Sequence, residues 1–307
     1  MKRIHLDTDL GSDTDDLCAL AMLLGWPDVA VSGVTTVSDP EGRRAGWTAY
    51  ALALAGSEDV PVEAGAAGSL AGFTIPLAFP AYWPDPVDPR PSAPGAAVDL
   101  LVTAAERGDT IVAIGPYTNL ALVEAGRPGL LATTELVVMG GHVPDPGQGL
   151  PMWGPADDTN VQQDAFASAI VFARCAPVVV PLSTTQRVTL RATHLDPLRR
   201  GGALARLLAD QGEAHARDLG RTELGRAFPA LPDDLLNFQY DPLACAVAAG
   251  WDGVTRSELP VGTTIRQGVL HMAIEPGAPT LRVATDVDGP AFDAAWLDAV
   301  LRASQPR

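Results

Sequence analysis

The densest group of side chains with chemical potential is an acidic segment near the N-terminus. Asp7, Asp9, Asp13, Asp15 and Asp16 follow directly on an apolar stretch. Carboxylates this close together repel one another unless a cation lies among them. Among hard divalent cations, Ca²⁺ accepts about six to eight oxygen ligands, whereas Mg²⁺ tends to keep several of its waters. The segment therefore predicts a metal site, and the number of carboxylates favours Ca²⁺.

A structural role is the alternative for part of this segment. Asp15 and Asp16 precede an Ala/Leu-rich run and could cap a helix, which would leave the other carboxylates in solvent. An EF-hand is not supported, because a twelve-residue loop that starts at Asp7 ends at Cys18, where that motif requires a bidentate Glu.

The elements that position these residues alternate along the chain. Short β-branched runs alternate with Ala/Leu-rich runs, which is typical of a parallel sheet covered by helices on both faces. Strands are predicted at residues 3–6, 29–37, 110–114, 136–139 and 178–182, with short β-runs over 256–284, and helices at 17–24, 43–55, 120–125 and 290–302, with mainly helical structure over 190–236. No composition shift marks a boundary. We predict a single α/β domain over residues 1–307, with a mostly parallel open sheet and a Rossmann-like core.

Two segments rich in Pro and Gly interrupt this alternation, at residues 68–95 and 140–157. Loops this long inside a compact domain are usually functional or disordered. Both contain aromatic side chains, which are Phe79, Tyr82 and Trp83 in the first and Trp153 in the second. We therefore expect flap-like loops beside a binding site.

Charge and composition exclude several classes of protein. Lys and Arg total 21 against 37 Asp and Glu, for a net charge of −16, which argues against binding nucleic acids or anionic membranes. Cys18, Cys175 and Cys245 are widely spaced, so neither a disulfide framework nor a zinc site is indicated. No export signal is evident, and no run approaches the roughly 18 apolar residues of a membrane span. We expect a cytoplasmic protein that binds a small molecule.

The acidic segment also has the form of a known motif. Strand-Asp-x-Asp-x-Gly-x-Asp-x-Asp-Asp-x-x-Ala-Leu, which starts at Asp7, resembles the signature of the inosine-uridine nucleoside hydrolase family in a lengthened variant, with Leu10 where Pro is common. Other segments resemble family segments in family order: residues 33–37, 60–65, 115–121, 137–141, 160, 241–244 and 282–284. The resemblance implies an enzyme that uses Ca²⁺ to hydrolyse the N-glycosidic bond of a ribonucleoside. Family members are usually dimers or tetramers, which implies a homodimer or homotetramer here.

The resemblance also implies a metal-binding set. Asp9 would be both a Ca²⁺ ligand and the base that takes a proton from water, and Asp16 would be a bidentate ligand. Thr118 would offer its backbone carbonyl to the metal, and Asp241 its carboxylate to metal and sugar.

Further residues would bind the substrate. Asp15 would hold the ribose 2′-hydroxyl, with Asp13 as the alternative because the motif is two residues longer than the common form. Asn160 and Asp158 would contact ribose hydroxyls, and Asp39 is one more substrate-binding candidate.

The predicted fold supports these assignments independently. Residues after the first strand, in the 115–119 loop and at Asp241 converge only at the carboxyl edge of a parallel sheet, where open α/β folds bind ligands. Each residue taken singly also has a structural interpretation: Asp241 and Pro242 could begin a helix, Thr118 could cap one, and Asn160 could close a turn.

Three positions depart from the family pattern. Tyr240 stands where many members have His on the leaving-group side, which implies a catalytic role for it. A neutral phenol can donate a hydrogen bond but is a poorer acid than an imidazolium. Residues 68–95 contain no His, so His142 is the nearest substitute, although it could be a solvated loop residue. Met152 stands where members often have an Asn for the 5′-hydroxyl, which favours an apolar 5′ substituent. We expect a preference for bases that leave easily, helped by stacking on Phe79, Tyr82, Trp83 or Trp153.

Two other functions remain open. Asp7 and Asp9 also resemble the Asp-x-Asp pair of haloacid-dehalogenase-like phosphatases that use Mg²⁺, although Lys2 is the only lysine in the chain and the remaining aspartates would be unexplained. A protein that binds a nucleoside or sugar on the same fold without cleaving it is the second alternative, motivated by Tyr240 and Met152.

Overall fold

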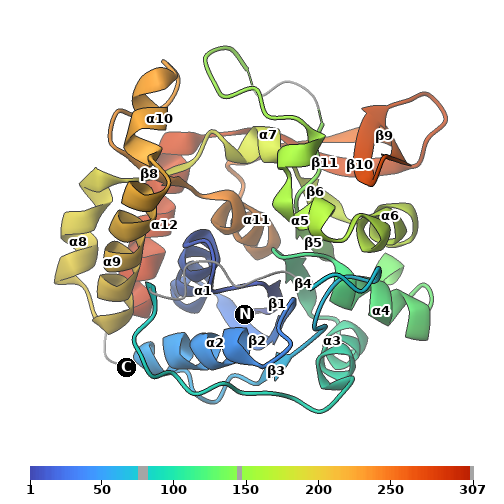
Figure 1. The fold of residues 1–307 in the computed structure, drawn as a ribbon, viewed down its shortest axis with the longest axis horizontal. Coiled ribbons are helices and arrows are strands. Elements are labelled where there is room, and N and C mark those ends of the chain that lie inside the picture. The colour runs from blue at the N-terminus through green and yellow to red at the C-terminus, as the bar shows by residue number, and fades with distance from the viewer. Residues whose placement is uncertain (75–81, 144–146, 305–307) are drawn as a thin grey trace.

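The computed structural model describes residues 1–74, 82–143 and 147–304. Within these residues, most strands form one nine-stranded sheet that runs through the middle of the molecule (Figure 1). Its spatial order is β10 (Val269–Ile274), β9 (Val254–Arg266), β11 (Thr280–Val287), β6 (Val178–Val180), β5 (Leu136–Met139), β4 (Thr110–Ala113), β1 (Lys2–Thr8), β2 (Val29–Thr36) and β3 (Val62–Ala64). The predicted α/β class is confirmed.

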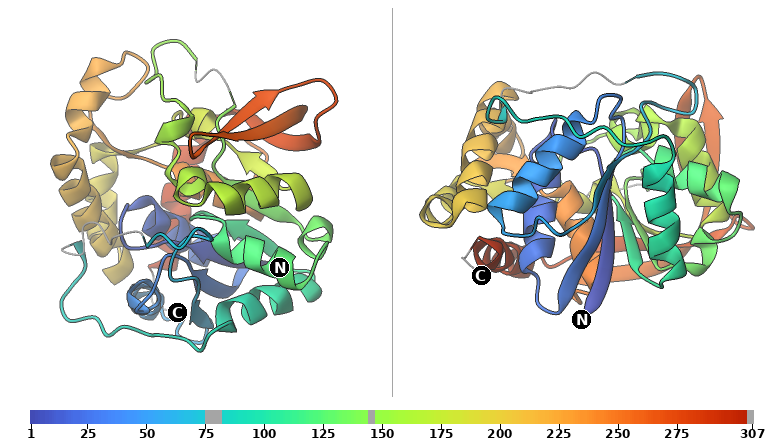
Figure 2. Two further views of the ribbon diagram at one scale, coloured as in Figure 1. Left: turned by 45° about the vertical axis from the view of Figure 1, so that its right-hand side comes forward. Right: turned by 90° about the horizontal axis from the view of Figure 1, so that it is seen from below.

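Parallel pairing dominates the sheet. Strands β3, β2, β1, β4, β5, β6 and β11 pair in parallel, whereas β9 runs antiparallel to β11 and to β10. The β9–β10 hairpin extends away from the body of the molecule (Figure 2). Because the parallel strands share one direction, their carboxyl ends share one edge of the sheet.

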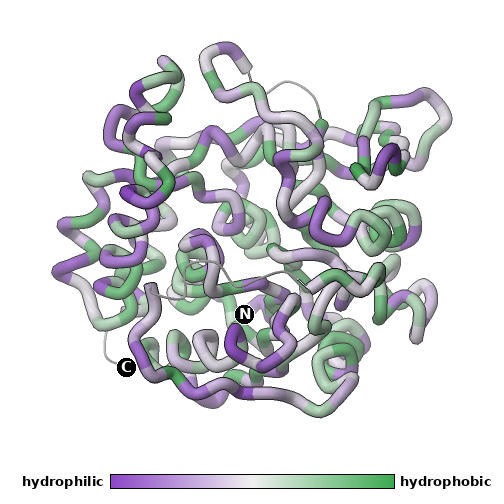
Figure 3. Tube along the Cα trace, viewed as in Figure 1, coloured by the Kyte–Doolittle hydropathy of each residue, from purple (hydrophilic) through white to green (hydrophobic). Residues whose placement is uncertain are grey.

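Helices cover both faces of the sheet, as the alternation of the sequence predicts. One side carries α1 (Asp15–Gly25), α2 (Arg43–Leu54), α7 (Leu182–Thr185), α8 (Leu195–Arg200), α9 (Ala203–Asp218), α11 (Tyr240–Ala249) and α12 (Gly289–Ala303). The other side carries α3 (Ala96–Glu106), α4 (Thr118–Gly126), α5 (Thr159–Gln163) and α6 (Ala165–Arg174). The outer helices α8 and α9 carry both hydrophilic and hydrophobic residues (Figure 3), since only one side of each is buried.

Alternation of side chains along the strands explains why two cores form. In β4, Ile111 packs into the core under α3 and α4, whereas Val112 packs into the core under α1 and α11. Val137 and Val138 divide between the two cores in the same way along β5. A strand buried on both faces must be apolar at every position, which is the pattern of its sequence.

Residues 190–236 contain more than the predicted helices. Helices α8, α9 and α10 (Arg221–Ala227) are present, but β7 (Thr189–Arg191) and β8 (Leu235–Phe238) pair as a separate two-stranded antiparallel sheet. Strand β8 of this sheet lies between α10 and α11 in the chain. Three-residue and four-residue strands lie below the length at which periodicity distinguishes them from helix.

The first aromatic loop, residues 68–95, is mostly exposed where the structure describes it, but Trp83 packs inside the protein. Trp83 is buried and stacks on Trp47 with a ring separation of 5.4 Å. The Tyr82 hydroxyl donates to Asp218 at 2.8 Å. Phe79 lies outside the described residues. The expectation that Trp83 stacks on a ligand is therefore wrong. None of the described helices is both long enough and apolar enough to cross a membrane.

Candidate active site

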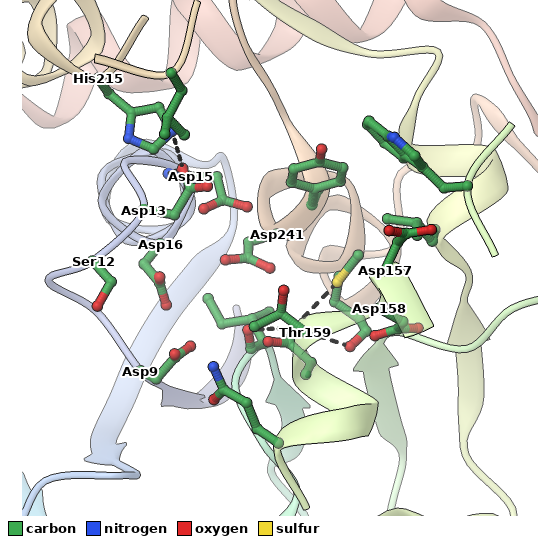
Figure 4. Close-up of a pocket in the computed structure, with 18 of the residues that line it drawn as sticks. Asp9, Ser12, Asp13, Asp15, Asp16, Asp157, Asp158, Thr159, His215 and Asp241 are labelled. Carbon is green, nitrogen blue, oxygen red and sulfur yellow. Dashed lines mark hydrogen bonds and ion pairs between the residues drawn. The ribbon is translucent and has the colours of Figure 1, made fainter. Parts of the chain in front are cut away.

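A cavity of about 480 Å³ opens at the carboxyl edge of the main sheet. Its walls come from the segment after β1, from Ile114 after β4, from Met139 at the end of β5 and from the first turn of α11. Asp9, Asp15, Asp16 and Asp241 are drawn around this common space in Figure 4. The predicted meeting of distant segments at this edge is confirmed by their position, and the volume is in the range of small-molecule sites.

Three buried carboxylates lie at the centre of one wall. Asp15 and Asp16 belong to the first turn of α1 and Asp241 to the first turn of α11, and one oxygen from each lies within 4.8 Å of the others. Thr8 donates its hydroxyl to Asp16. Burial, and then the charges of neighbouring carboxylates, raise the pKa of all three well above the usual range.

This carboxylate group fits a hard divalent cation. All its donors are oxygens and it is buried, and the charge of Arg44 offsets only part of the repulsion at Asp16. A cation would offset both the burial and the mutual repulsion that raise these pKa values. The structure thus brings the predicted ligands Asp16 and Asp241 together and adds Asp15, which the sequence assigned to the ribose.

Asp9 lines the same cavity, outside this group of three. Arg44, which is 1% exposed, donates to the backbone carbonyls of Asp9 and Leu10, the latter at 3.1 Å, and its Nη2 lies 3.9 Å from Asp9 Oδ2. Burial raises the pKa of Asp9, and the charge of Arg44 opposes that rise. Arg44 therefore holds the loop that carries Asp9, a role that the sequence analysis missed.

The facing wall contains Asp158 and Asn160, as predicted. Asn160 Nδ2 donates to the Ile114 carbonyl at 2.8 Å. Asp158 accepts from the backbone N–H groups of Val161, at 3.1 Å, and Gly141, so it also caps α5. Burial raises the pKa of Asp158 to about 6 despite these two hydrogen bonds.

The third wall was not predicted. His215, from α9, is 1% exposed, lines the cavity and places Nε2 3.3 Å from Asp13 Oδ1. Asn237 Nδ2 donates to the same Asp13 oxygen at 2.5 Å. Burial favours a raised pKa for Asp13, but the charges of His215 and Arg221 hold it below the usual range. Asp13 therefore faces His215 while Asp15 joins the carboxylate group, and which of them holds the ribose 2′-hydroxyl stays a prediction.

Aromatic side chains lie beside this third wall. Tyr240 and Trp153 both line the cavity, with their ring centres 6.2 Å apart. Phe238 packs against both rings. Burial raises the pKa of Tyr240 well above its usual range, so its phenol keeps its proton. Trp153 is the predicted stacking residue that the structure places at the cavity.

Four predicted site residues do not line the cavity: Thr118, Asp39, Met152 and His142. The Thr118 hydroxyl donates to Asp164 at 2.7 Å, and the residue of that segment that lines the cavity is Ile114. Asp39 accepts from the backbone N–H groups of Arg44, at 3.1 Å, and Ala45, at 2.9 Å, and so binds the start of α2.

Met152 and His142 belong to the second loop. Met152 is 80% exposed and outside the cavity lining, so the predicted contact with a 5′ substituent is wrong. His142 Nε2 lies 2.9 Å from the Trp153 carbonyl, and His142 supports the loop without lining the cavity.

Comparisons with known proteins agree with this site. The family model described as inosine-uridine preferring nucleoside hydrolase matches residues 4–294. The chain belongs to this family. A pyrimidine-specific ribonucleoside hydrolase, RihA, of Salmonella paratyphi A is 31% identical over 223 residues, which cover 67% of this chain and 69% of that protein. The chain is therefore a nucleoside hydrolase, an enzyme that hydrolyses the N-glycosidic bond of ribonucleosides.

Solved structures support the fold. A plant nucleoside hydrolase, PpNRh1, has a TM-score of 0.78 at 22% identity, with 99% of each chain covered. A purine-preferring ribonucleoside hydrolase from Gardnerella vaginalis has a TM-score of 0.76 at 22% identity, also with 99% of each chain covered. The family match favours this fold and chemistry over the phosphatase alternative.

Proposed function

We propose that this protein is a calcium-dependent ribonucleoside hydrolase whose reaction takes place in the cavity at the carboxyl edge of the sheet. The observation that carries the proposal is the buried group of Asp15, Asp16 and Asp241 oxygens, all within 4.8 Å of one another, with Asp9 in the same cavity. Burial of three like charges without a cation is unfavourable. The proposal makes these carboxylates the ligands of one bound cation.

Asp15, Asp16 and Asp241 would hold the cation, and Asp9, in the same cavity, would be a further ligand. A bound Ca²⁺ neutralises these carboxylates and makes a nearby water easier to deprotonate. Calcium is favoured over magnesium because every side-chain donor in this group is a carboxylate that would replace water.

The protein's own residues then carry the hydrolysis. Asp9 takes the proton of the attacking water while the water oxygen forms a bond to C1′ of the ribose. Positive charge grows on the sugar as the C1′–N bond breaks, and the surrounding carboxylates stabilise it electrostatically. Asp158 and Asn160, on the facing wall, hold ribose hydroxyls and so fix C1′ above Asp9.

The nucleobase lies between the third wall and the aromatic side chains. Trp153 and Tyr240 offer ring faces that any nucleobase could contact. The RihA relative is named for pyrimidine nucleosides, so uridine and cytidine are the first substrates to test. A cytoplasmic location and assembly as a homodimer or homotetramer stay predictions.

Release of free base and ribose tests the proposal. Uridine, cytidine, inosine and adenosine are incubated with the protein and CaCl₂, and both products are followed by chromatography and a reducing-sugar assay. We expect equal amounts of base and ribose from at least one nucleoside. A protein that binds a nucleoside, as shown by calorimetry, without releasing either product would instead be a binding protein on this fold.

A further inference from the structure

The departing base needs a proton, and the position next to Asp241 does not supply it. Cleavage of the C1′–N bond sends its electron pair to the base nitrogen, so an ordinary base leaves more readily if an acid protonates it. Tyr240 is a poor source, because burial raises the pKa of its phenol well above the usual range. His142 lies outside the cavity lining.

His215 is placed differently from every other histidine of the chain. All five histidines lie in the part of the chain that the structure describes, and His215 is the one that lines the cavity. It comes from α9, on the side of the cavity formed by Arg221 and Tyr240. Figure 4 shows its ring above the Asp13 and Asp15 carboxylates.

The surroundings of His215 place a fixed carboxylate against its ring. Nε2 lies 3.3 Å from Asp13 Oδ1, and Asn237 donates to that same oxygen at 2.5 Å, which fixes the carboxylate. The Tyr82 ring packs edge-on at 6.0 Å. The charged and titratable groups near it include Asp13 from the acidic loop, Asp15 from α1, Arg221 from α10, Tyr240 from α11 and Tyr82 from the first aromatic loop. Asp13 contacts it through the Nε2–Oδ1 pair.

We propose that His215, oriented by Asp13, is the general acid that protonates the departing nucleobase. The inference rests on the proposed hydrolase function and adds a residue to it. Nε2, the nitrogen on the Asp13 side of the ring (Figure 4), transfers the proton to a ring nitrogen of the base, and Asp13 orients it. Asp9 gains a proton from water as His215 loses one, so the reaction leaves the total charge of the two residues unchanged.

This assignment replaces the expectation of a site limited to activated bases. The absence of His at position 240 and in residues 68–95 is compensated from a different element. It also gives a role to Asp13, the additional carboxylate of the lengthened motif, which contacts the imidazole and lies outside the group of three.

A pair of substrates tests the proposal. Uridine or inosine requires protonation of its base, whereas p-nitrophenyl β-D-ribofuranoside releases a phenolate that leaves without it. His215→Ala should lower kcat for the nucleoside by about 10²-fold or more and leave most of the rate with the p-nitrophenyl riboside. His215→Gln, which keeps an amide of similar reach but no transferable proton, should show the same split.

A matched control is His271→Ala, since His271 lies on β10 of the projecting hairpin. It should leave both rates unchanged. Equal losses on both substrates in the Ala and Gln variants would assign His215 a structural role and overturn the inference, while the hydrolase function stands. A nucleoside rate that both variants retain would also overturn it. If the wild-type protein cleaves neither substrate, the proposed function itself is wrong.

Discussion

Replacing Asp241 with Asn should make the cation-free protein more stable. The three oxygens lie within 4.8 Å of one another, and at an effective dielectric constant of about 20 each ionised pair at that distance costs about 3.5 kcal/mol. Asp241 takes part in two of the three pairs, so with all three carboxylates ionised its charge costs at least about 7 kcal/mol. Protonation of one carboxylate relieves this repulsion, but at about pH 8, roughly four units above the ordinary pKa of Asp, protonation costs about 5.6 kcal/mol.

The same substitution should weaken the response to calcium. A ligand at about 1,000 times its Kd stabilises the folded state by about 4 kcal/mol, and loss of one of three carboxylates removes much of that affinity. In a chelator at about pH 8, Asp241→Asn should therefore unfold at a higher temperature than the wild type. In millimolar CaCl₂, the wild type should gain the larger increase in Tm.

Differential scanning calorimetry with and without chelator measures both effects. Asp252→Asn is the matched control, because Asp252 is an exposed carboxylate just beyond the end of α11 and its charge should not matter. Equal Tm values for wild type and Asp241→Asn in chelator, together with no calcium shift in either, would refute the view that these carboxylates are assembled for a cation.

Three further predictions concern neighbouring residues. Asp9→Asn should lower kcat by about 10²-fold or more on the best nucleoside, as expected for loss of a positioned base; near wild-type turnover would contradict the mechanism. Arg44→Met should destabilise the protein by about 3–5 kcal/mol in chemical unfolding, since it removes the buried guanidinium that contacts the carbonyls of Asp9 and Leu10 and the Asp9 carboxylate. Arg43→Met, at an exposed ion pair, is the control and should change stability by less than about 1 kcal/mol. Burial raises the pKa of Asp7 to about 7 from 3.8, so the folded state binds an additional proton between about pH 4 and 7. The unfolding free energy in chelator should therefore fall by roughly 4 kcal/mol as the pH rises through that range. Asp7→Asn, whose Oδ1 can still accept from Thr35 and Asn119, should flatten this pH dependence, and an unchanged slope would contradict the prediction.

Local patterns in the sequence predict much of the fold. The long strand β2 and the helix α2 follow from their periodicity and lie within a residue of the expected bounds. Strand β3, with three residues, and the β7–β8 pair give no comparable pattern. Their pairing depends on neighbours that are distant along the chain, which periodicity does not report.

The site divides in the same way. Asp16 and Asp241 belong to recognisable motifs that precede helices, so their meeting at the sheet edge was predictable. His215 lies within a helix without any local motif, and its position at the cavity depends on how α9 packs beside α1. The loop after β4 shows a related limit. Thr118 was expected to offer its backbone carbonyl to the metal, but Ile114 is the residue that lines the cavity. Every residue has a backbone carbonyl, so residue type does not indicate which one faces the site.

Met152 shows that register in a loop is weakly determined by sequence. It precedes Trp153, which lines the cavity, yet Met152 itself is 80% exposed. No strand or helix periodicity constrains which side chain of residues 147–154 turns inward. An insertion or deletion of one residue in such a segment exchanges the inward and outward positions.

The central claim is that a cation held by Asp15, Asp16 and Asp241 supports nucleoside hydrolysis, and restoration of activity tests it most directly. Protein freed of metal with a chelator and then dialysed is assayed for ribose release from its best nucleoside, before and after CaCl₂ is added back. We expect activity to be lost on chelation and restored by calcium in wild type, and not restored in Asp241→Asn. Equal ribose release before and after calcium, or full restoration in Asp241→Asn, would contradict the account.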